Sequence, residues 1–213
     1  PTMDEFFADM ARLYREELAD LYTAGCRYVQ FDDTNLAYLC DENMRENARA
    51  LGEDPDELPE TYAALINASI KDRLDDMAGC IHLCRGNAKS QWFASGGYEP
   101  VAEKLFNLTE VDGFFLEYDD ERSGGFEPLR FVPKGNKNIV LGLITTKRGE
   151  LESKDELKQR IDEAAKYVDI DQLCLSPQCG FSSNAVGNLI TVDDQINKLR
   201  LVKETAEEIW GRE

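Results

Sequence analysis

Segments with helical hydrophobic spacing alternate with short strand-like runs along this sequence, and that alternation allows few architectures. Residues 3–21 have apolar side chains at helical spacing, and Thr2 with Glu5 forms a capping-box pattern before them. A strand-like run at 27–32 follows. Comparable units recur, so we expect further strands at 79–84, 113–118, 138–144 and 173–176, and further helices at 59–77, 98–108, 154–167 and 192–210.

Strands that alternate with helices favour parallel pairing through right-handed crossovers, as in α/β proteins. We expect polar loops at 41–59, with a short helix near 43–51, and at 121–133. The five expected strands would suffice for an open doubly wound sheet, whereas a complete (β/α)₈ barrel needs about eight strands and typically about 250 residues. No glycine-rich phosphate-binding motif follows an expected strand, which disfavours a nucleotide-binding sheet.

The composition excludes several classes of function. Lys and Arg total 24 against 42 Asp and Glu, so the net charge is −18, which argues against binding to nucleic acid or to an anionic membrane surface. No apolar run approaches the roughly 20 residues that span a bilayer. With six cysteines in a chain of this length and no signal peptide, we expect reduced thiols in a cytoplasmic protein, with metal binding as the chemistry to seek.

Potential metal ligands stand where the expected strands end. Alternate residues of a strand share a face, so His82 and Cys84 point the same way at the end of one strand. Glu117 ends the next strand, and Cys179 follows the last. The carboxyl ends of parallel strands meet at one edge, where active sites form. An imidazole, two thiolates and a carboxylate are a donor set suited to tetrahedral zinc.

Each of these residues also has a purely structural interpretation. A His-x-Cys pair in an apolar strand is more often core packing than a metal site, and a glutamate that ends a strand is commonly solvated. A strand cysteine is usually a small buried hydrophobe, which is our interpretation of Cys26, Cys80 and Cys174. The combination is more specific than its parts, because the only histidine of the chain belongs to it.

Three other polar features stand near the same edge. Gln30 and Asp32 share a face of the first strand, and Asp32 either binds a substrate ammonium group or caps a loop. Arg85 either binds a substrate carboxylate or lies solvated in a turn. The acidic run at 117–121 either binds a hard cation or forms an exposed loop.

Four segments together resemble the cobalamin-independent methionine synthase family in its C-terminal barrel. Val-Gln-Phe-Asp-Asp-Thr-Asn-Leu at 29–36 is similar to the family's Ile-Gln-Ile-Asp-Glu-Pro-Ala-Leu segment. Ile-His-Leu-Cys-Arg-Gly-Asn at 81–87 resembles its His-x-Cys zinc segment. Phe-Leu-Glu-Tyr-Asp-Asp at 115–120 and Pro-Gln-Cys-Gly-Phe at 177–181 resemble the segments of the third and last ligands. The similarity covers nearly the whole chain and is greatest to shorter, single-barrel methyltetrahydropteroyltriglutamate–homocysteine methyltransferase-like proteins.

This resemblance implies a fold, a metal and a reaction. Residues 1–213 would be the C-terminal part of a single zinc-binding domain, a partial (β/α)₈ TIM barrel with about the last five βα units. The resemblance implies a Zn²⁺ cofactor and transfer of a methyl group to a small thiol such as homocysteine, making methionine. The donor would be of the 5-methyltetrahydrofolate type, but residues 142–147 lack a histidine that assists the donor in the family.

The resemblance also assigns roles to particular residues. The zinc ligands would be His82, Cys84, Glu117 and Cys179, and no catalytic residue is assigned beyond them. Asp32 would contact the amino group of the substrate, with Gln30 beside it on the same face. Coordination by zinc lowers the pKa of a thiol, which is about 8.5 in free cysteine, and retains a nucleophile.

Two other functions and one assembly state remain as hypotheses from the sequence. The chain could be a non-catalytic barrel fragment, or a metal-free, decarboxylase-like TIM-barrel enzyme that binds carboxylates through arginine. Basic residues are sparse at the strand ends, Arg85 being the main one, which disfavours the second. A partial barrel would expose two unpaired sheet edges and an apolar interior, so we expect a homo-oligomer or another association through those edges.

Overall fold

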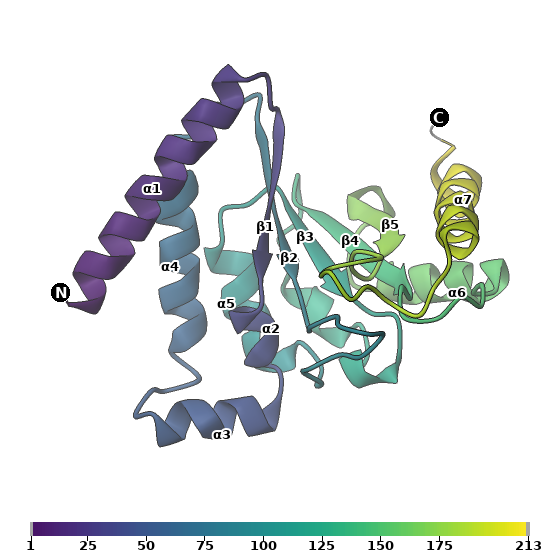
Figure 1. Ribbon diagram of the computed structural model, residues 1–213, viewed down its shortest axis with the longest axis horizontal. Helices are drawn as coiled ribbons and strands as arrows, with labels where there is room; N and C mark the ends of the chain where they lie inside the picture. Colours follow the sequence, from purple (N-terminus) through teal and green to yellow (C-terminus); the bar gives the residue numbers. More distant parts are fainter. Residues whose placement is uncertain (1, 212–213) are drawn as a thin grey trace.

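The computed structural model describes residues 2–211, which form one five-stranded parallel sheet with flanking helices (Figure 1). Its order is β1-β2-β3-β4-β5, the same as the order along the chain. A doubly wound sheet reverses its strand order at a switch point, and this sheet has no reversal. The architecture is therefore the expected partial (β/α)₈ barrel. The strands are β1 (Tyr28–Asp33), β2 (Ala78–Leu83), β3 (Gly113–Glu117), β4 (Asn138–Ile144) and β5 (Leu173–Pro177).

Seven α-helices accompany the sheet within the described residues. In Figure 1, α1 and α4 lie side by side beyond β1, while α6 and α7 lie beyond β4 and β5. The side chain of Thr2 accepts a hydrogen bond from the backbone of Glu5, which confirms the capping box of the first helix. The helices are α1 (Met3–Thr23), α2 (Asn35–Tyr38), α3 (Glu42–Ala50), α4 (Leu58–Ile70), α5 (Glu99–Leu108), α6 (Lys154–Ala164) and α7 (Val192–Trp210).

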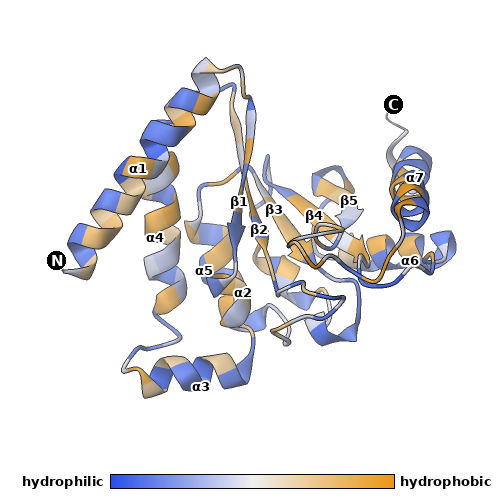
Figure 2. Ribbon diagram, viewed as in Figure 1, coloured by the Kyte–Doolittle hydropathy of each residue, from blue (hydrophilic) through white to orange (hydrophobic). Residues whose placement is uncertain are grey.

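The main core lies between the sheet and its helices. Side chains of one parity along the central strands are buried there, and Figure 2 shows the apolar colouring concentrated along these strands. The rings of Phe114 on β3 and Phe106 on α5 meet edge to face, with centroids 5.1 Å apart. Side chains of the other parity, including Cys80, His82 and Glu117, therefore lie on the opposite face of the sheet.

One connection follows the sequence-based expectation and one differs from it. The loop expected at 121–133 carries two short 3₁₀ turns, η1 (Glu121–Ser123) and η2 (Glu127–Phe131), and Gly124 between them has a positive φ of 69°. The helix expected at 59–77 ends at Ile70. Residues beyond it form a turn, which Arg73 holds by bonding the Met77 carbonyl and the Asp112 carboxylate.

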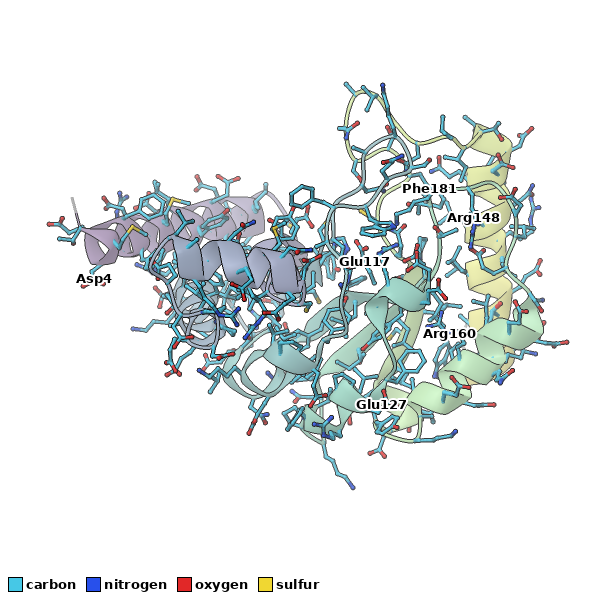
Figure 3. All side chains as sticks on the ribbon, turned by 90° about the horizontal axis from the view of Figure 1, so that it is seen from below. Asp4, Glu117, Glu127, Arg148, Arg160 and Phe181 are labelled. Carbon is cyan, nitrogen blue, oxygen red and sulfur yellow. The ribbon has the colours of Figure 1, made fainter. Side chains whose placement is uncertain are left out.

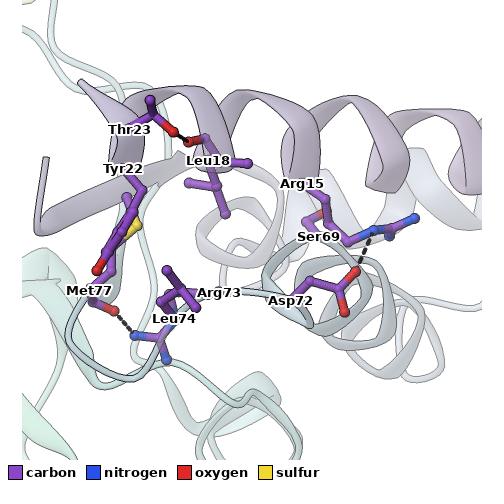
Figure 4. A pocket seen from close by; sticks show the side chains of 10 residues that line it. Arg15, Leu18, Tyr22, Thr23, Ser69, Asp72, Arg73, Leu74 and Met77 are labelled. Carbon is purple, nitrogen blue, oxygen red and sulfur yellow. Dashed lines mark hydrogen bonds and ion pairs between the residues drawn. The ribbon is translucent and has the colours of Figure 1, made fainter. Parts of the chain in front are cut away.

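A small cavity of about 290 Å³ lies where α1 meets this turn (Figure 4). Arg15 pairs with Asp72 across it at 3.4 Å, and Arg73 bonds Met77 at its other side. The polar groups of the cavity are thus already engaged within the protein, so we interpret it as a packing seam. Across residues 2–211, no helix combines the length and the apolar character needed to cross a membrane.

A buried ion pair attaches α7 to the segment that follows β4. Lys198 is fully buried, and its ammonium donates to the Glu150 carbonyl at 2.6 Å and to Glu152 Oε2 at 3.0 Å. Glu152 Oε1 in turn accepts the backbone N–H of Thr145 at 2.9 Å. Helix α7 is therefore connected through one lysine to the end of β4.

Replacing Lys198 should destabilise the fold, because Lys198→Met leaves the Glu152 carboxylate uncompensated. We expect the free energy of unfolding to fall by about 3 kcal/mol, measured by urea titration. The matched control is Lys203→Met, which removes an exposed partner of Glu207 on the same helix and should change little. Equal losses in the two variants would contradict this account of α7.

Candidate metal centre

The four predicted ligands meet at the carboxyl edge of the sheet. One donor atom from each of His82, Cys84, Glu117 and Cys179 lies within 4.8 Å of the other three. His82 is on β2 and Cys84 directly follows it; Glu117 is the last residue of β3, and Cys179 follows β5. Figure 3 places Glu117 in the interior, between the N-terminal helices and α7. The structure thus brings together residues that are up to 97 positions apart (179 − 82).

The imidazole of His82 is held by a carboxylate on the neighbouring strand. Its Nδ1 lies 2.9 Å from Asp32 Oδ1, and its Nε2 lies 3.4 Å from Glu117 Oε1 and 3.1 Å from the Gln178 carbonyl oxygen. Burial lowers the pKa of His82, but its hydrogen bonds to Asp32 and Glu117 outweigh burial and raise the pKa to about 10. Metal-binding histidines commonly have this arrangement, in which one ring nitrogen bonds a carboxylate and the other nitrogen faces the remaining metal ligands.

The two thiols of the site interact directly. Cys84 Sγ and Cys179 Sγ are 3.9 Å apart, and the Ser183 hydroxyl lies 3.4 Å from Cys179 Sγ. Their mutual hydrogen bond raises the pKa of Cys84 and lowers the pKa of Cys179 to about 6. The lowered pKa of Cys179 favours its thiolate, which is the form that binds metal.

The Glu117 carboxylate is wholly buried and is bonded at both oxygens. Oε1 accepts the backbone N–H of Arg85 at 3.2 Å, and Oε2 accepts from Arg122 Nη2 at 2.9 Å. Burial raises the pKa of Glu117, but the hydrogen bond and charge of His82 outweigh burial and lower it. The Tyr98 hydroxyl accepts the backbone N–H of Glu117 at 2.9 Å, which further fixes its position.

Gly142 on β4 allows the segment that carries Cys179 to approach. A Cβ at this position would lie 2.7 Å from the Gln178 Cα and 2.8 Å from the Leu116 carbonyl oxygen, which is too close for any side chain. The Gln178 side chain then accepts the backbone N–H of Thr146 at 3.0 Å. Gly142 and the amide side chain of Gln178 thus position Cys179, the fourth candidate metal ligand.

The predicted substrate-binding residues lie on β1 beside the group. Asp32 pairs in register with His82 and keeps 67% of its side chain exposed. Gln30 shares this face but pairs with Cys80, further from the strand end, and its side-chain oxygen accepts a hydrogen bond from Tyr28 at 2.8 Å. Asp32 therefore borders the four-residue group, and Gln30 is bonded along its own strand.

Arg85 does not line the site in the way that carboxylate binding requires. Its side chain is fully buried, with the guanidinium 4.4 Å from the centroid of the Tyr98 ring. A buried guanidinium is closed to a substrate, which removes the main support for a decarboxylase-like enzyme. The interpretation of Arg85 as a solvated turn residue is wrong for the same reason.

Sequence reasoning missed the cations that surround the acidic run after β3. Asp119 is almost fully buried and pairs with Arg122 at 2.9 Å and with Lys147 at 3.3 Å. Asp120 pairs with Arg122 at 2.6 Å. This run is therefore an internal salt-bridge network. The available signal was an arginine soon after the acids and a lysine at the end of the next strand.

The donor set fits a zinc ion by its chemistry. Two sulfur atoms, one imidazole nitrogen and one carboxylate oxygen are the number and type of ligands that tetrahedral zinc takes. Thiolates select against magnesium and calcium, which prefer oxygen ligands. The second ring nitrogen of His82 and the second oxygen of Glu117 already have protein partners.

Comparison with known proteins agrees with this geometry. Residues 2–207 match the family model described as cobalamin-independent synthase, catalytic domain. The uncharacterized protein YxjH of Bacillus subtilis is 52% identical over 97% of this chain and 55% of its own length. A methionine synthase of Pyrococcus horikoshii is 24% identical over 93% of this chain and 52% of its own length.

A solved structure is similar over nearly the whole chain. It comes from Listeria monocytogenes, is described as a candidate vitamin-B12-independent methionine synthase, and superposes with a TM-score of 0.79 at 44% identity. The similarity covers 99% of this chain and 57% of that protein. The chain thus spans about half the length of the relatives it matches. By the family match over residues 2–207, this chain belongs to the cobalamin-independent synthase catalytic-domain family.

Proposed function

We propose that this protein acts in zinc-dependent methyl transfer to a small thiol such as homocysteine, forming methionine. The observation that carries the proposal is the group of four donors within 4.8 Å at the carboxyl edge of the sheet. Membership of the cobalamin-independent synthase family supports the reaction, and the resemblance suggests a 5-methyltetrahydrofolate-type donor. On this proposal, residues 1–213 form the C-terminal part of the zinc-binding barrel domain.

In this proposal the site residues divide the work of holding metal and substrate. His82, Cys84, Glu117 and Cys179 would hold the ion, which supplies a Lewis acid that lowers the pKa of a substrate thiol. A carboxylate oxygen is a harder and weaker donor than a thiolate for zinc, so Glu117 would hold the ion less tightly than the two cysteines. A reducing compartment such as the cytoplasm would keep the two cysteines available as ligands.

Asp32 is suited to two tasks at once. Its Oδ1 accepts the Nδ1–H of His82, and this hydrogen bond leaves Nε2 facing the other candidate metal ligands. The exposed remainder of the carboxylate can accept the ammonium group of an amino-acid thiol. The substrate would then be held at its amino group while its sulfur reaches the ligand group.

Metal analysis tests the centre. The reduced chain, reconstituted with Zn²⁺ and freed of excess metal, should retain about one zinc per chain by elemental analysis. Cys84→Ser and Cys179→Ser should weaken zinc binding by on the order of tenfold or more, because each removes a thiolate donor. Cys26→Ser is the matched control, since the Cys26 thiol donates to the Tyr28 carbonyl oxygen and is not one of the four candidate ligands. A wild-type chain that retains no zinc would refute the proposal.

Thiol titration tests the role of Asp32. In the Co²⁺-substituted chain, sulfur binding can be followed by absorption without any methyl donor. Asp32→Asn should weaken binding of homocysteine by roughly tenfold or more, because it removes a charge-assisted partner of the ammonium group. Binding of 4-mercaptobutyrate, which lacks the amino group, should change far less. If binding of both thiols weakens equally, Asp32 acts only by holding His82 and does not bind the ammonium group.

We also propose that a second copy covers the open edges of the sheet. Within the described residues, β1 and β5 each have a strand neighbour on one side only, and unpaired edges favour association. An apolar groove between α1 and α4 is lined by residues such as Phe7, Ala11 and Leu65. Light scattering should give a mass of about twice 24.1 kDa. A concentration-independent monomer would contradict this assembly.

A further inference from the structure

Arg122 is a buried arginine that pairs with Glu117 and with two neighbouring aspartates. It lies in η1, five positions after Glu117, and only 5% of its side chain is exposed. Its Nη2 donates to Glu117 Oε2 and to Asp119 Oδ1, both at 2.9 Å. Its Nη1 donates to Asp120 Oδ2 at 2.6 Å. One guanidinium therefore connects three carboxylates.

These contacts give the two oxygens of Glu117 different surroundings. Oε2 faces the guanidinium, whereas Oε1 lies 3.4 Å from His82 Nε2, on the side of the other donors. Charge-assisted hydrogen bonds from arginine are among the strongest side-chain interactions. Rotation of the carboxylate to present both oxygens to an ion would break the bond to Arg122 within a buried site, where an unpaired charge is costly.

Arg122 is itself held in place from several directions. The Asp120 side chain accepts its backbone N–H at 3.1 Å, and its carbonyl oxygen accepts the N–H of Gly96 at 2.8 Å. The Trp92 ring lies over the guanidinium with its centroid 5.6 Å away. Lys147 shares Asp119, so this carboxylate has a second cation. The guanidinium thus has little freedom to follow a moving partner.

We propose that Arg122 is a positioning residue that makes Glu117 a one-oxygen metal ligand. Arg122 retains Oε2, so only Oε1 is presented beside His82, Cys84 and Cys179. A single oxygen keeps the coordination number at four, whereas two oxygens would raise it to five. This inference rests on the proposed metal centre and concerns how one of its ligands is held.

Cobalt substitution tests this role without an activity assay. The full chain is loaded with Co²⁺, whose visible d–d absorption is intense in four-coordinate sites and weaker in five-coordinate ones. Wild type should show the intense bands. Arg122→Met should lose intensity and bind zinc more weakly by on the order of tenfold or more, in competition with a chromophoric chelator. Arg122→Lys, which keeps the charge and one donor, should fall between them.

Two controls separate positioning from general destabilisation. Arg130→Met removes an exposed arginine that pairs with Glu99 away from the site, and it should match wild type. In a Glu117→Ala background, Arg122→Met should have no further effect on zinc affinity, because Arg122 acts through Glu117. If Arg122→Met does not fold, the comparison of Arg122→Lys with wild type replaces it in both backgrounds.

The outcomes that overturn the two proposals differ. Cobalt bands of unchanged intensity with zinc affinity within about twofold of wild type would refute the role of Arg122 and leave the metal centre standing. If Arg122→Met weakens zinc binding equally in the wild-type and Glu117→Ala backgrounds, the proposal is also refuted, because Arg122 would then not act through Glu117. A wild-type chain that binds neither cobalt nor zinc would refute the metal centre itself.

Discussion

A carboxylate with no solvent exposure stands at the end of β3, and its charge has to be balanced from within the protein. The balance for Glu117 comes from the His82 ring, the backbone N–H of Arg85 and the guanidinium of Arg122. The partners come from the end of β2 and from η1, so the carboxylate can be buried only if β2, β3 and η1 are correctly aligned. The same interactions that satisfy this charge place the sulfur and nitrogen donors beside it.

Two further ion pairs join separate elements of the fold. Lys198 ties α7 to the segment after β4 through Glu152, and Arg73 ties the end of α4 to β2 and β3 through Asp112. A chain with a net charge of −18 has a surplus of carboxylates, and Lys198 and Arg73 each use one of them to join separate elements. The parallel sheet supplies the scaffold, and these ion pairs fix the positions of the helices and connecting segments around it.

Much of the candidate site could be predicted because its signals are local. His82 and Cys84 share a strand face by parity, Glu117 ends an apolar run, and parallel strands place their carboxyl ends together. The boundaries were less predictable. The helix expected to reach residue 77 stops at Ile70, because bonds from Arg73 to Met77 and Asp112 compete with helix continuation. That competition involves another segment and leaves no trace in local spacing.

The sequence by itself determined the alternation of helices and strands, the parallel sheet it implies, and which donors stand at strand ends, because hydrophobic period and side-chain parity act over a few residues. Only the tertiary structure decided that Arg85 turns into the core, that the acidic run after β3 is neutralised by Arg122 and Lys147, and that the oxygens of Glu117 face different partners. The contacts of Arg85 with Tyr98, of Lys147 with Asp119 and of Glu117 with His82 depend on register and packing between segments, as does the contact of His82 with Gln178, 96 residues away. Local sequence preferences carry no information about such pairings.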